Sequence, residues 1–311
     1  MDRIDALRAF VLAVDLGSLA AAARTLERSP AAITRAIASI EDRLGAEILR
    51  RTTRALRLTE PGERYLAVAR RVLAELDGAE QSAAASKSTP HGTLVVTAPL
   101  GFGAMHVQPV VEAYLAAYDD VRARLLLLDR VVNVVDEGVD VAVRIGELPD
   151  SALVAVGVGH VRRVVVASAK YLARNGTPRS PADLTAHRCV SLTAVTPSDT
   201  WSFKPGRDGE RAKQVKVRPV LSVNAADAAI KAAAADLGVT CVISYQAAAM
   251  VRSGELVRIL APYEPAPVPV QLVYPASSAR SAKGRAFVEL AGPRLRKTLR
   301  KIATSMGDGG A

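Results

Sequence analysis

Cysteine is scarce in this chain, with only Cys189 and Cys241 among 311 residues. Two thiols are too few for the disulfide framework of a small secreted domain, so that class of protein is excluded. No apolar run reaches 18 residues, which excludes a membrane-spanning helix. The first residues, MDRIDALRAF, include acids and lack the apolar segment of a signal peptide. We therefore expect a cytoplasmic protein with no membrane partner.

Histidine is also scarce, and the common catalytic motifs are missing. The four histidines have no spacing typical of metal ligands; they are His91, His106, His160 and His187. The chain has neither a G-x-S-x-G motif nor a Walker phosphate loop. Gly101-Phe102-Gly103 is not followed by the third glycine of a dinucleotide fingerprint. We expect no enzyme, no metal and no cofactor.

Acidic residues are outnumbered by basic ones. Lys and Arg total 41 against 31 Asp and Glu, and the net charge of +10 favours a polyanionic partner. The most informative basic segment is residues 48–59, ILRRTTRALRLT, which contain four arginines and no acid. A solvated basic face is the alternative explanation for this segment. Half of the residues are hydrophobic, and 311 residues suffice for two or three domains.

Residues 17–45, GSLAAAARTLERSPAAITRAIASIEDRLG, contain two short helical patterns joined by a polar break at residues 27–29. Ser29 is a preferred N-cap, Pro30 suits a first helical turn, and Gly45 stands where a C-terminal cap is expected. An apolar stripe before them predicts another helix that ends at Gly17; it consists of Ile4, Leu7, Phe10, Val11 and Val14. This pattern is typical of a helix-turn-helix, whose second helix enters the DNA major groove.

The second helix of this motif has two faces. The apolar face is expected in the core and consists of Ile33, Ile37, Ile40 and Leu44. Ala31, Ala32, Thr34 and Arg35 lie near the N-terminal end, which usually meets the bases.

Residues 48–59 predict a two-stranded wing, because Leu56 and Leu58 alternate with Arg57 as in a short strand. Thr59 is expected to cap a long helix that runs to about Ser86. Apolar residues with heptad-like spacing on this helix predict a seam against a second copy of the chain: Leu66, Ala69, Leu73, Leu76 and Ala83. Residues 86–92 are expected to form a hinge.

Strand-like and helical runs alternate after Gly92, which predicts an α/β sheet with crossover helices. Strands are expected at 93–98, 124–128, 139–145, 161–168, 217–224, 239–244 and 270–275. Helices are expected at about 104–117, in a helix-rich stretch after residue 168, at about 225–236, and from Ser281 onward.

These segments together resemble the LysR-type transcriptional regulators over essentially the full length. The matching phrases are AAARTLERSPAAITRAIASIEDRLG, LRRTTRALRLTEPGERY, APLGFG, DEGVDVAVRIGELPDSALVA, ASAKYLARNGTP and PADLTAHRCV. The resemblance implies a winged helix-turn-helix at 1–60, a linker and dimerisation helix with its hinge at 61–91, and an effector-binding domain at 92–311. That α/β domain is expected to be two-lobed and like a periplasmic binding protein, with lobe one at about 92–161 and 269–301 and lobe two at about 162–268.

The resemblance also implies partners and contacts. It implies binding to double-stranded DNA as a homodimer or dimer of dimers, a small-molecule effector between the lobes, and RNA polymerase at promoters. The expected DNA-binding residues are Ser29, Pro30, Ala31, Ala32, Thr34, Arg35, Arg50, Arg51, Thr52, Thr53 and Arg54. Thr34 and Arg35 match a Ser-Arg pair common in the family, so Arg35 is the leading contact to a base or phosphate. The expected dimer interface is Leu66, Ala69, Leu73 and Leu76.

The expected effector-binding residues follow the family's pocket segments: Pro99, Leu100, Gly101, Phe102, Arg144, Ile145, Thr193, Asn224 and Ile243. Free N–H groups at the helix after Pro99 favour anions. Many relatives carry hydroxyls in this turn, whereas Leu100, Gly101 and Phe102 replace them here, so a more apolar ligand is an alternative to a simple carboxylate. For Arg144, an ion pair with Asp140 or Glu147 is the alternative to ligand contact.

Departures from the family leave a rival function open. Pro30, Ala31 and Ala36 stand where the family often has polar residues, which favours a cytoplasmic solute-binding protein with a vestigial DNA-binding head. The intact Arg35 and the wing arginines count against this rival. Some relatives sense oxidants through cysteine, but burial as small apolar residues is the commoner role for Cys189 and Cys241.

Overall fold

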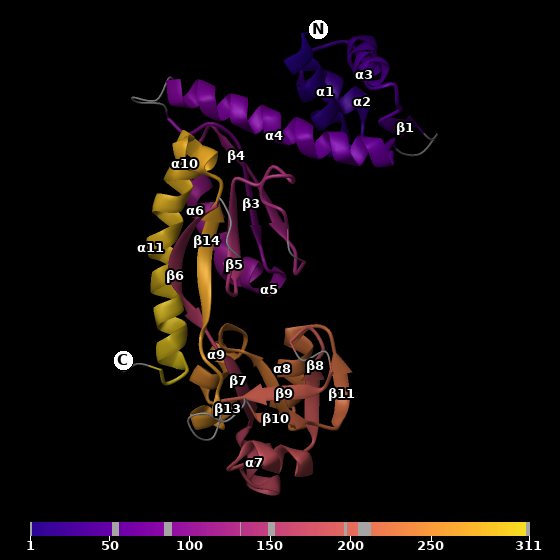
Figure 1. The fold of residues 1–311 in the computed structure, drawn as a ribbon. Helices are drawn as coiled ribbons and strands as arrows, with labels where there is room; N and C mark the ends of the chain where they lie inside the picture. The colour runs from indigo at the N-terminus through magenta and orange to yellow at the C-terminus, as the bar shows by residue number, and fades with distance from the viewer. Residues whose placement is uncertain are drawn as a thin grey trace.

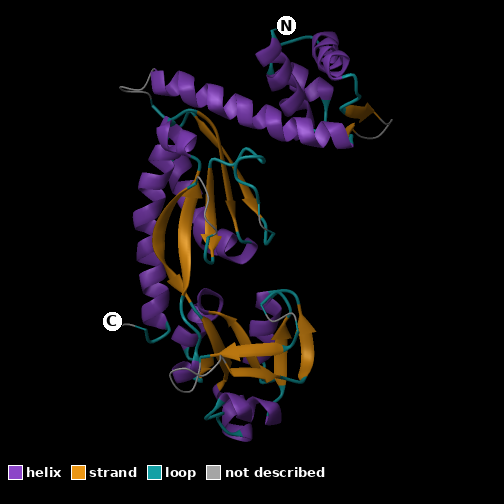
Figure 2. Cartoon of the chain, in the orientation of Figure 1, coloured by secondary structure: helices purple, strands orange, loops and turns teal. Residues whose placement is uncertain are grey.

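The computed structural model describes residues 2–51, 56–83, 89–130, 132–148, 153–195, 198–204 and 213–308. A small helical head and a long helix, α4 (Glu60–Ala83), lie above an effector domain that is built on two five-stranded sheets (Figures 1 and 2). Among the described residues no helix is long and apolar enough to cross a membrane.

The head contains the three expected helices, α1 (Arg3–Asp15), α2 (Leu19–Thr25) and α3 (Pro30–Leu44). The Ser29 hydroxyl accepts a hydrogen bond from the Ala32 amide at 3.2 Å and caps α3, while Gly45 ends it with a left-handed φ of 64°. Ile33, Ile37 and Ile40 are buried as expected. Leu44 is 43% exposed, so its assignment to the core was wrong: α3 ends there, beyond the reach of α1 and α2.

The expected wing is present as the antiparallel strands β1 (Leu49–Arg51) and β2 (Leu56–Leu58). Glu41 on α3 anchors it, because one carboxylate oxygen accepts hydrogen bonds from the amides of Ile48 and Leu49 at 2.9 and 3.3 Å. Thr59 caps α4 by accepting a hydrogen bond from the Gly62 amide at 3.1 Å. A side chain at Gly62 would overlap the carbonyl oxygen of Ile48, so glycine lets α4 pack close against the wing.

The first part of the apolar stripe of α4 packs within the protomer. Leu66 and Ala69 are 8% and 1% exposed, and both belong to the core of the head. Leu73 is half-buried against the same core. The assignment of Leu66 and Ala69 to a dimer interface was therefore wrong, because heptad spacing identifies a buried face without identifying its partner. Among the described side chains of α4, the exposed large apolar ones are Val68 and Val72, at 43% and 37%.

Lobe one is built on a five-stranded sheet with the order β4-β3-β5-β14-β6. Its strands are β3 (Gly92–Ala98), β4 (Val121–Leu127), β5 (Val141–Ile145), β6 (Val154–Val161) and β14 (Val268–Tyr274). Its helices are α5 (Leu100–Phe102), the π-helical turn η1 (Gly103–Val107), α6 (Gln108–Leu115), α10 (Ala276–Arg280) and α11 (Ala282–Ser305). β6 was not predicted from the sequence, because its two glycines obscure the strand pattern.

Lobe two is built on a second five-stranded sheet with the order β11-β8-β12-β7-β13. Its strands are β7 (Arg163–Ser168), β8 (Cys189–Leu192), β11 (Pro219–Val223), β12 (Val239–Ile243) and β13 (Leu256–Ile259). A separate hairpin pairs β9 (Thr200–Phe203) with β10 (Lys213–Lys216). Its helices are α7 (Ala169–Asn175), the 3-10 turns η2 (Pro181–Ala186) and η3 (Ala261–Tyr263), α8 (Ala226–Ala234) and α9 (Ser244–Ser253).

The stretch between residues 168 and 217 was expected to be rich in helix, and only its first part, with α7 and η2, fits that expectation. The remainder contains three strands that were not predicted, and all four residues of β8 are buried. Short strands that are buried on both faces lack the alternation that identifies strands in sequence. β13 was missed as well.

The head contacts the effector domain through Asp15 at the end of α1. Its carboxylate pairs with Arg70 of α4 at 2.5 Å and with Arg124 of β4 at 2.8 Å. Asp15 is 19% exposed, so solvent only partly screens these pairs. One carboxylate thus connects the head, the long helix and lobe one.

Candidate DNA-binding and effector sites

The first group of expected DNA contacts lies at the N-cap and in the first turns of α3. Ser29, Pro30, Ala31 and Arg35 are exposed, while Ala32 and Thr34 are half-buried. Ala36 is 4% exposed and faces the core, so its departure from glutamine removes no polar group from the outward face. The outward face of α3 has therefore lost fewer polar residues, relative to the family, than the sequence suggested, and the case for a vestigial head is weaker.

The wing places basic side chains beside α3. Arg50 on β1 is paired in register with Arg57 on β2, and both are exposed. Arg50 and Thr34 both line a groove between α3 and the first wing strand. The acid near Arg50 is Glu47 at 4.0 Å, and because both side chains are about 75% exposed, this pair leaves Arg50 available to phosphate. The expected contacts Thr52, Thr53 and Arg54 lie outside the described residues, and only the backbone of Arg51 is described.

The expected effector residues lie at strand ends in both lobes. In lobe one, Pro99 follows β3 and Ile145 ends the neighbouring parallel strand β5. In lobe two, Thr193, Asn224 and Ile243 follow or end the parallel strands β8, β11 and β12. The Thr193 amide donates to the carbonyl of Val223 at 2.8 Å, which holds Thr193 beside Asn224. Crevices outside the carboxyl ends of such strands are the usual ligand sites of α/β sheets.

The helix start after Pro99 already has an anionic partner. The Leu100 amide donates a hydrogen bond to a carboxylate oxygen of Asp129 at 2.9 Å. A ligand carboxylate at this amide would meet the charge of Asp129 and would have to displace it. Leu100 itself is 53% exposed. The local chemistry therefore favours an apolar group or a hydrogen-bond donor over a carboxylate.

An aromatic contact joins the two lobes at this place. The buried ring of Phe102 lies edge-on to Tyr245 of α9, with centroids 5.2 Å apart, and His106 lies within 5.8 Å of Tyr245 and 5.0 Å of Phe102. Burial raises the pKa of the Tyr245 hydroxyl to about 12, so this group is neutral. The buried Nε2 of His106 has no hydrogen-bond partner among the described residues. Phe102 was predicted from the sequence as a site residue, whereas His106, Tyr245 and Asp129 were not.

Burial of His106 predicts a pH-dependent lobe contact. Desolvation lowers the pKa of His106 from its ordinary 6.5, so the folded protein favours the neutral ring. The unfolded chain takes up a proton near pH 6.5, and stability from this group is lost as the pH falls below that value. We expect the urea midpoint of unfolding to be lower at about pH 5.5 than at about pH 7.5. In His106→Phe this decrease should be smaller. His91→Gln, at an exposed position, is the control; an equal fall in His106→Phe would contradict the assignment.

Arg144 donates to the backbone carbonyl of Val132 in its own lobe. Burial lowers the pKa of its guanidinium, while the charge of Glu137 acts in the opposite direction. Asp140, one suggested partner, pairs instead with Lys283 at 3.0 Å. Ligand contact by Arg144 stays a prediction.

Both cysteines are buried, and burial raises the pKa of each thiol to about 12. Little thiolate forms at neutral pH, and the thiolate is the form that reacts with oxidants. Their environment fits the apolar role that sequence analysis favoured. Among the described residues no cluster of His, Cys, Asp or Glu has the geometry of a metal site.

Two family models match the parts of the chain that carry these sites. Residues 4–63 match the bacterial regulatory helix-turn-helix protein, lysR family, and residues 87–296 match the LysR substrate binding domain. The chain belongs to the LysR family of transcriptional regulators. It is a DNA-binding regulator with an effector-binding domain, as its sequence predicted.

Individual LysR proteins are similar over most of the chain. The probable HTH-type transcriptional regulator LtrA of Klebsiella pneumoniae is 32% identical over 83% of this chain and 82% of its own length. The solved structure of CrgA, a LysR-type regulator from Neisseria meningitidis, is 29% identical, covers 94% of this chain and 98% of its own, and has a TM-score of 0.59. Full-length OxyR C199D from Pseudomonas aeruginosa, at 17% identity, 95% coverage of both chains and a TM-score of 0.69, shows the same fold.

Proposed function

We propose that this LysR protein binds an interrupted palindrome as a homodimer or a dimer of dimers. In this proposal α3 and the arginines of the wing contact DNA. The observation that carries it is the division of α3: its isoleucines are buried, while Pro30, Ala31 and Arg35 face outward. Arginine pairs with guanine O6 and N7, and the exposed Ala31 suits a thymine methyl group. Ser29, Ala32, Thr34 and Arg50–Arg54 complete the proposed contacts.

The proposed dimer surface is the outward face of α4. Val68, Val72 and Leu76 are spaced four residues apart and therefore share one face of the helix. Val68 and Val72 expose more than a third of their area, whereas Leu66 and Ala69 are used within the head. Leu76 remains from the interface that the sequence predicted.

The proposed effector binds between the lobes, near Pro99–Phe102, Ile145, Thr193, Asn224 and Ile243. Asp129 at the Leu100 amide and the ring of Phe102 favour an uncharged ligand with an apolar body. A hydrogen-bond donor on this ligand would pair with the orphaned Nε2 of His106. A ligand that separates Phe102 from Tyr245 would change the angle between the lobes. The pairs of Asp15 with Arg124 and Arg70 give lobe one a direct contact to the head and α4.

Two further assignments belong to this proposal. The protein works in the cytoplasm, and it contacts RNA polymerase at the promoters that it controls. No residue of the chain is assigned to either of them. The rival function, solute binding with a vestigial head, lost part of its support when Ala36 proved to be buried.

Binding of the purified full-length protein to fragmented source DNA at physiological salt tests the proposal. We expect a few enriched sites that share an interrupted palindrome. Affinity should fall steeply as salt rises, because phosphate contacts release counterions. Weak, unselective binding without a shared site would favour the solute-binding rival.

Arg35→Ala tests the leading contact at the enriched site. We expect a cost of about 1–3 kcal/mol, confined to one base pair of each half-site. Arg43→Ala is a matched control, because Arg43 lies at the other end of α3 and bonds to Ser39 at 2.9 Å. Unchanged specificity in Arg35→Ala would show that Arg35 reads no base.

A further inference from the structure

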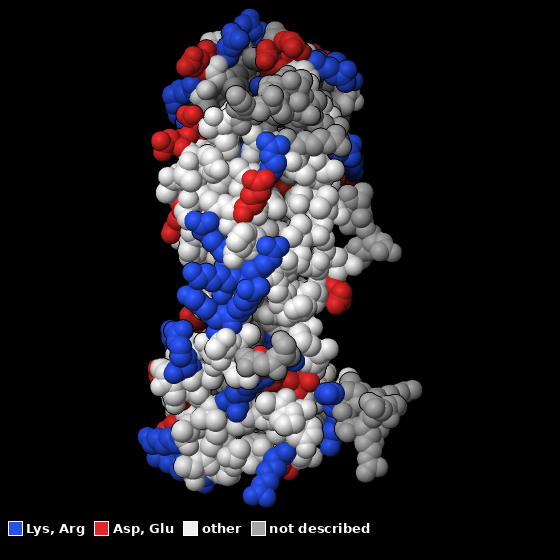
Figure 3. Space-filling model, turned by 90° about the vertical axis from the view of Figure 1, so that its left-hand side faces the viewer, with Lys and Arg blue, Asp and Glu red and all other residues white. Residues whose placement is uncertain are grey.

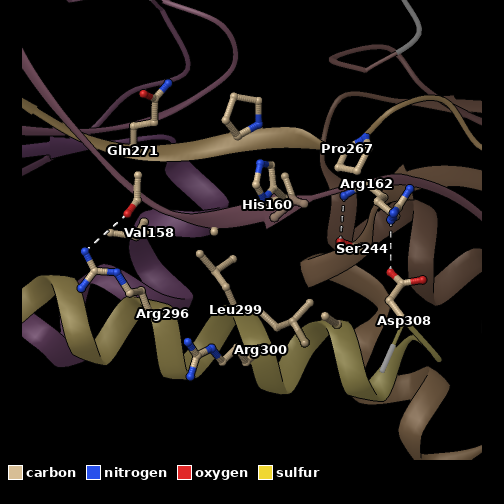
Figure 4. A pocket seen from close by; sticks show the side chains of 16 residues that line it. Val158, His160, Arg162, Ser244, Pro267, Gln271, Arg296, Leu299, Arg300 and Asp308 are labelled. Carbon is tan, nitrogen blue, oxygen red and sulfur yellow. Dashed lines mark hydrogen bonds and ion pairs between the residues drawn. The ribbon is translucent and has the colours of Figure 1, made fainter. Parts of the chain in front are cut away.

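A groove of about 590 Å³ lies between the C-terminal half of α11 and the strands that cross between the lobes (Figure 4). One wall is β6, from Gly157 to Val161, and the other is α11. Pro267 and Pro269 line the place where the chain returns to lobe one. Small-molecule sites in proteins usually have volumes of about 300–1,000 Å³, so the groove is large enough for a metabolite.

Two glycines of β6 shape this groove. At Gly159 the backbone has a φ of 149°, and a Cβ there would lie 2.9 Å from a methyl group of Leu299. Glycine therefore lets α11 pack close against β6 at this position. A Cβ at Gly157 would meet nothing within 4 Å, so open space remains beside this residue. The register between β6 and β14 shifts between Val270, which pairs with Gly159, and Gln271, which pairs with Gly157. This irregularity lies between the two glycines.

Basic side chains dominate the polar lining. Arg162, Arg296 and Arg300 line the groove together with one acid, Asp308. Asp308 is already paired, with Arg162 at 3.3 Å and with Arg258 at 2.8 Å. Arg296 and Arg300 have no carboxylate partner among the described residues, and the contact of Arg296 to the Gly157 carbonyl is long, at 3.5 Å. Two guanidinium groups on one helix face are therefore available to an anion.

The rest of the lining is apolar. Leu299 points from α11 toward β6 (Figure 4). Ile302, Ala303, Pro267 and Pro269 extend this surface. Such a wall suits a hydrocarbon body and offers little to a bare inorganic ion.

We propose that this groove binds a small amphipathic carboxylate. Its carboxylate lies at Arg296 and Arg300, since the planar guanidinium fork matches a carboxylate with two parallel hydrogen bonds. Its apolar body lies along Leu299, Pro267 and Pro269. The site is separate from the contact between Phe102 and Tyr245, near which Asp129 disfavours a carboxylate.

The position of the groove gives such a ligand influence over the lobes. Arg162 and Ser244 of lobe two line it together with β6 and α11 of lobe one. The Arg162 amide donates to the Ser244 hydroxyl at 3.1 Å, so the lining of lobe two is held as one unit. A ligand that contacts residues of both lobes favours one angle between the lobes over others.

The surrounding surface attracts anions. Figure 3 looks onto the α11 side of the molecule, where basic side chains gather. A second groove beside the first is lined by Arg252, Arg296, Lys297, Arg300 and Lys301. A surface of one sign raises the local concentration of ligands with the opposite charge.

Calorimetric titration of the full-length protein with octanoate tests the proposal. We expect one octanoate per protomer, and affinity about tenfold weaker or more in Arg296→Gln and in Arg300→Gln, because each loses a charged hydrogen bond. Lys297→Gln is the matched control: it removes the same charge from the same helix, but Lys297 does not line the groove. Its affinity should stay within about twofold of the parent.

Two other probes separate the parts of the site. Octan-1-ol keeps the apolar body without the charge, and inorganic phosphate keeps the charge without the body; both should bind far more weakly than octanoate. Equal binding of octan-1-ol, or equal binding of phosphate, would overturn the proposal. So would octanoate binding that Arg296→Gln and Arg300→Gln leave unchanged, because the acid would then occupy another place. These results do not depend on DNA binding.

Discussion

Val72→Asp on α4 is expected to dissociate the proposed dimer and to weaken binding to a palindromic site by about a hundredfold or more. Val72 is 37% exposed, and Val68 is 43% exposed on the same face, so a carboxylate there would be buried against a second copy. An unpaired charge in an apolar interface is costly. Half-site DNA, which needs one head, should lose little affinity. Sedimentation gives the mass, and fluorescence anisotropy on the two DNAs gives the affinities.

Two variants of neighbouring residues make this result specific. Arg71→Gln produces the same change in net charge at an exposed position without burying a carboxylate, and it should leave the mass unchanged. Leu73→Asp places the charge against the core of the head, so it should lower the thermal transition of the head and abolish half-site binding as well. A Val72→Asp protein that keeps its dimer mass would remove the exposed face of α4 from the interface.

The head was predictable from sequence because its signals are local. Ser29, Pro30 and Gly45 act within a few residues of their own positions, and each caps or starts α3 as expected. The apolar period likewise identified Ile33, Ile37 and Ile40 as core. The wrong assignment of Leu44 to the core also has a local cause. The apolar period of α3 continues to Leu44, one turn beyond the part of α3 that the other helices of the head cover.

The long-range features were not predictable in this way. The spacing of Leu66 and Ala69 is the same whether α4 packs on α1 or on a second chain, so sequence alone could not choose. Asp129 reaches the Leu100 amide across 29 residues, and Tyr245 meets Phe102 from the other lobe. No motif marks these partners, since only the folded sheets bring them together.

The largest stability effect is expected at Arg258 on β13, at the junction of the lobes. Its guanidinium binds both carboxylate oxygens of Glu264, at 2.6 and 2.5 Å, and also Asp308 and the carbonyl of Met306 at the end of α11. The hydrogen bonds to Glu264 are the largest cause that raises the pKa of Arg258 above its ordinary value. Glu264 is 3% exposed, so its charge depends on Arg258 for compensation.

Arg258→Met should therefore cost about 3–5 kcal/mol in the free energy of unfolding, because it leaves Glu264 charged, buried and unpaired. The double variant Arg258→Met with Glu264→Leu should recover most of that loss, since it removes both charges and fills the space with apolar atoms.

Arg130→Met is the matched control. Arg130 also binds both oxygens of one carboxylate, that of Glu137 at 2.8 Å, but its side chain is 59% exposed, so little change is expected. Urea unfolding of the four proteins provides the comparison. If Arg258→Met and Arg130→Met were equally mild, burial would not set the strength of the Arg258 pair. If the double variant stayed as unstable as Arg258→Met, the loss would come from Asp308 and the end of α11, whose attachment to lobe two also depends on Arg258.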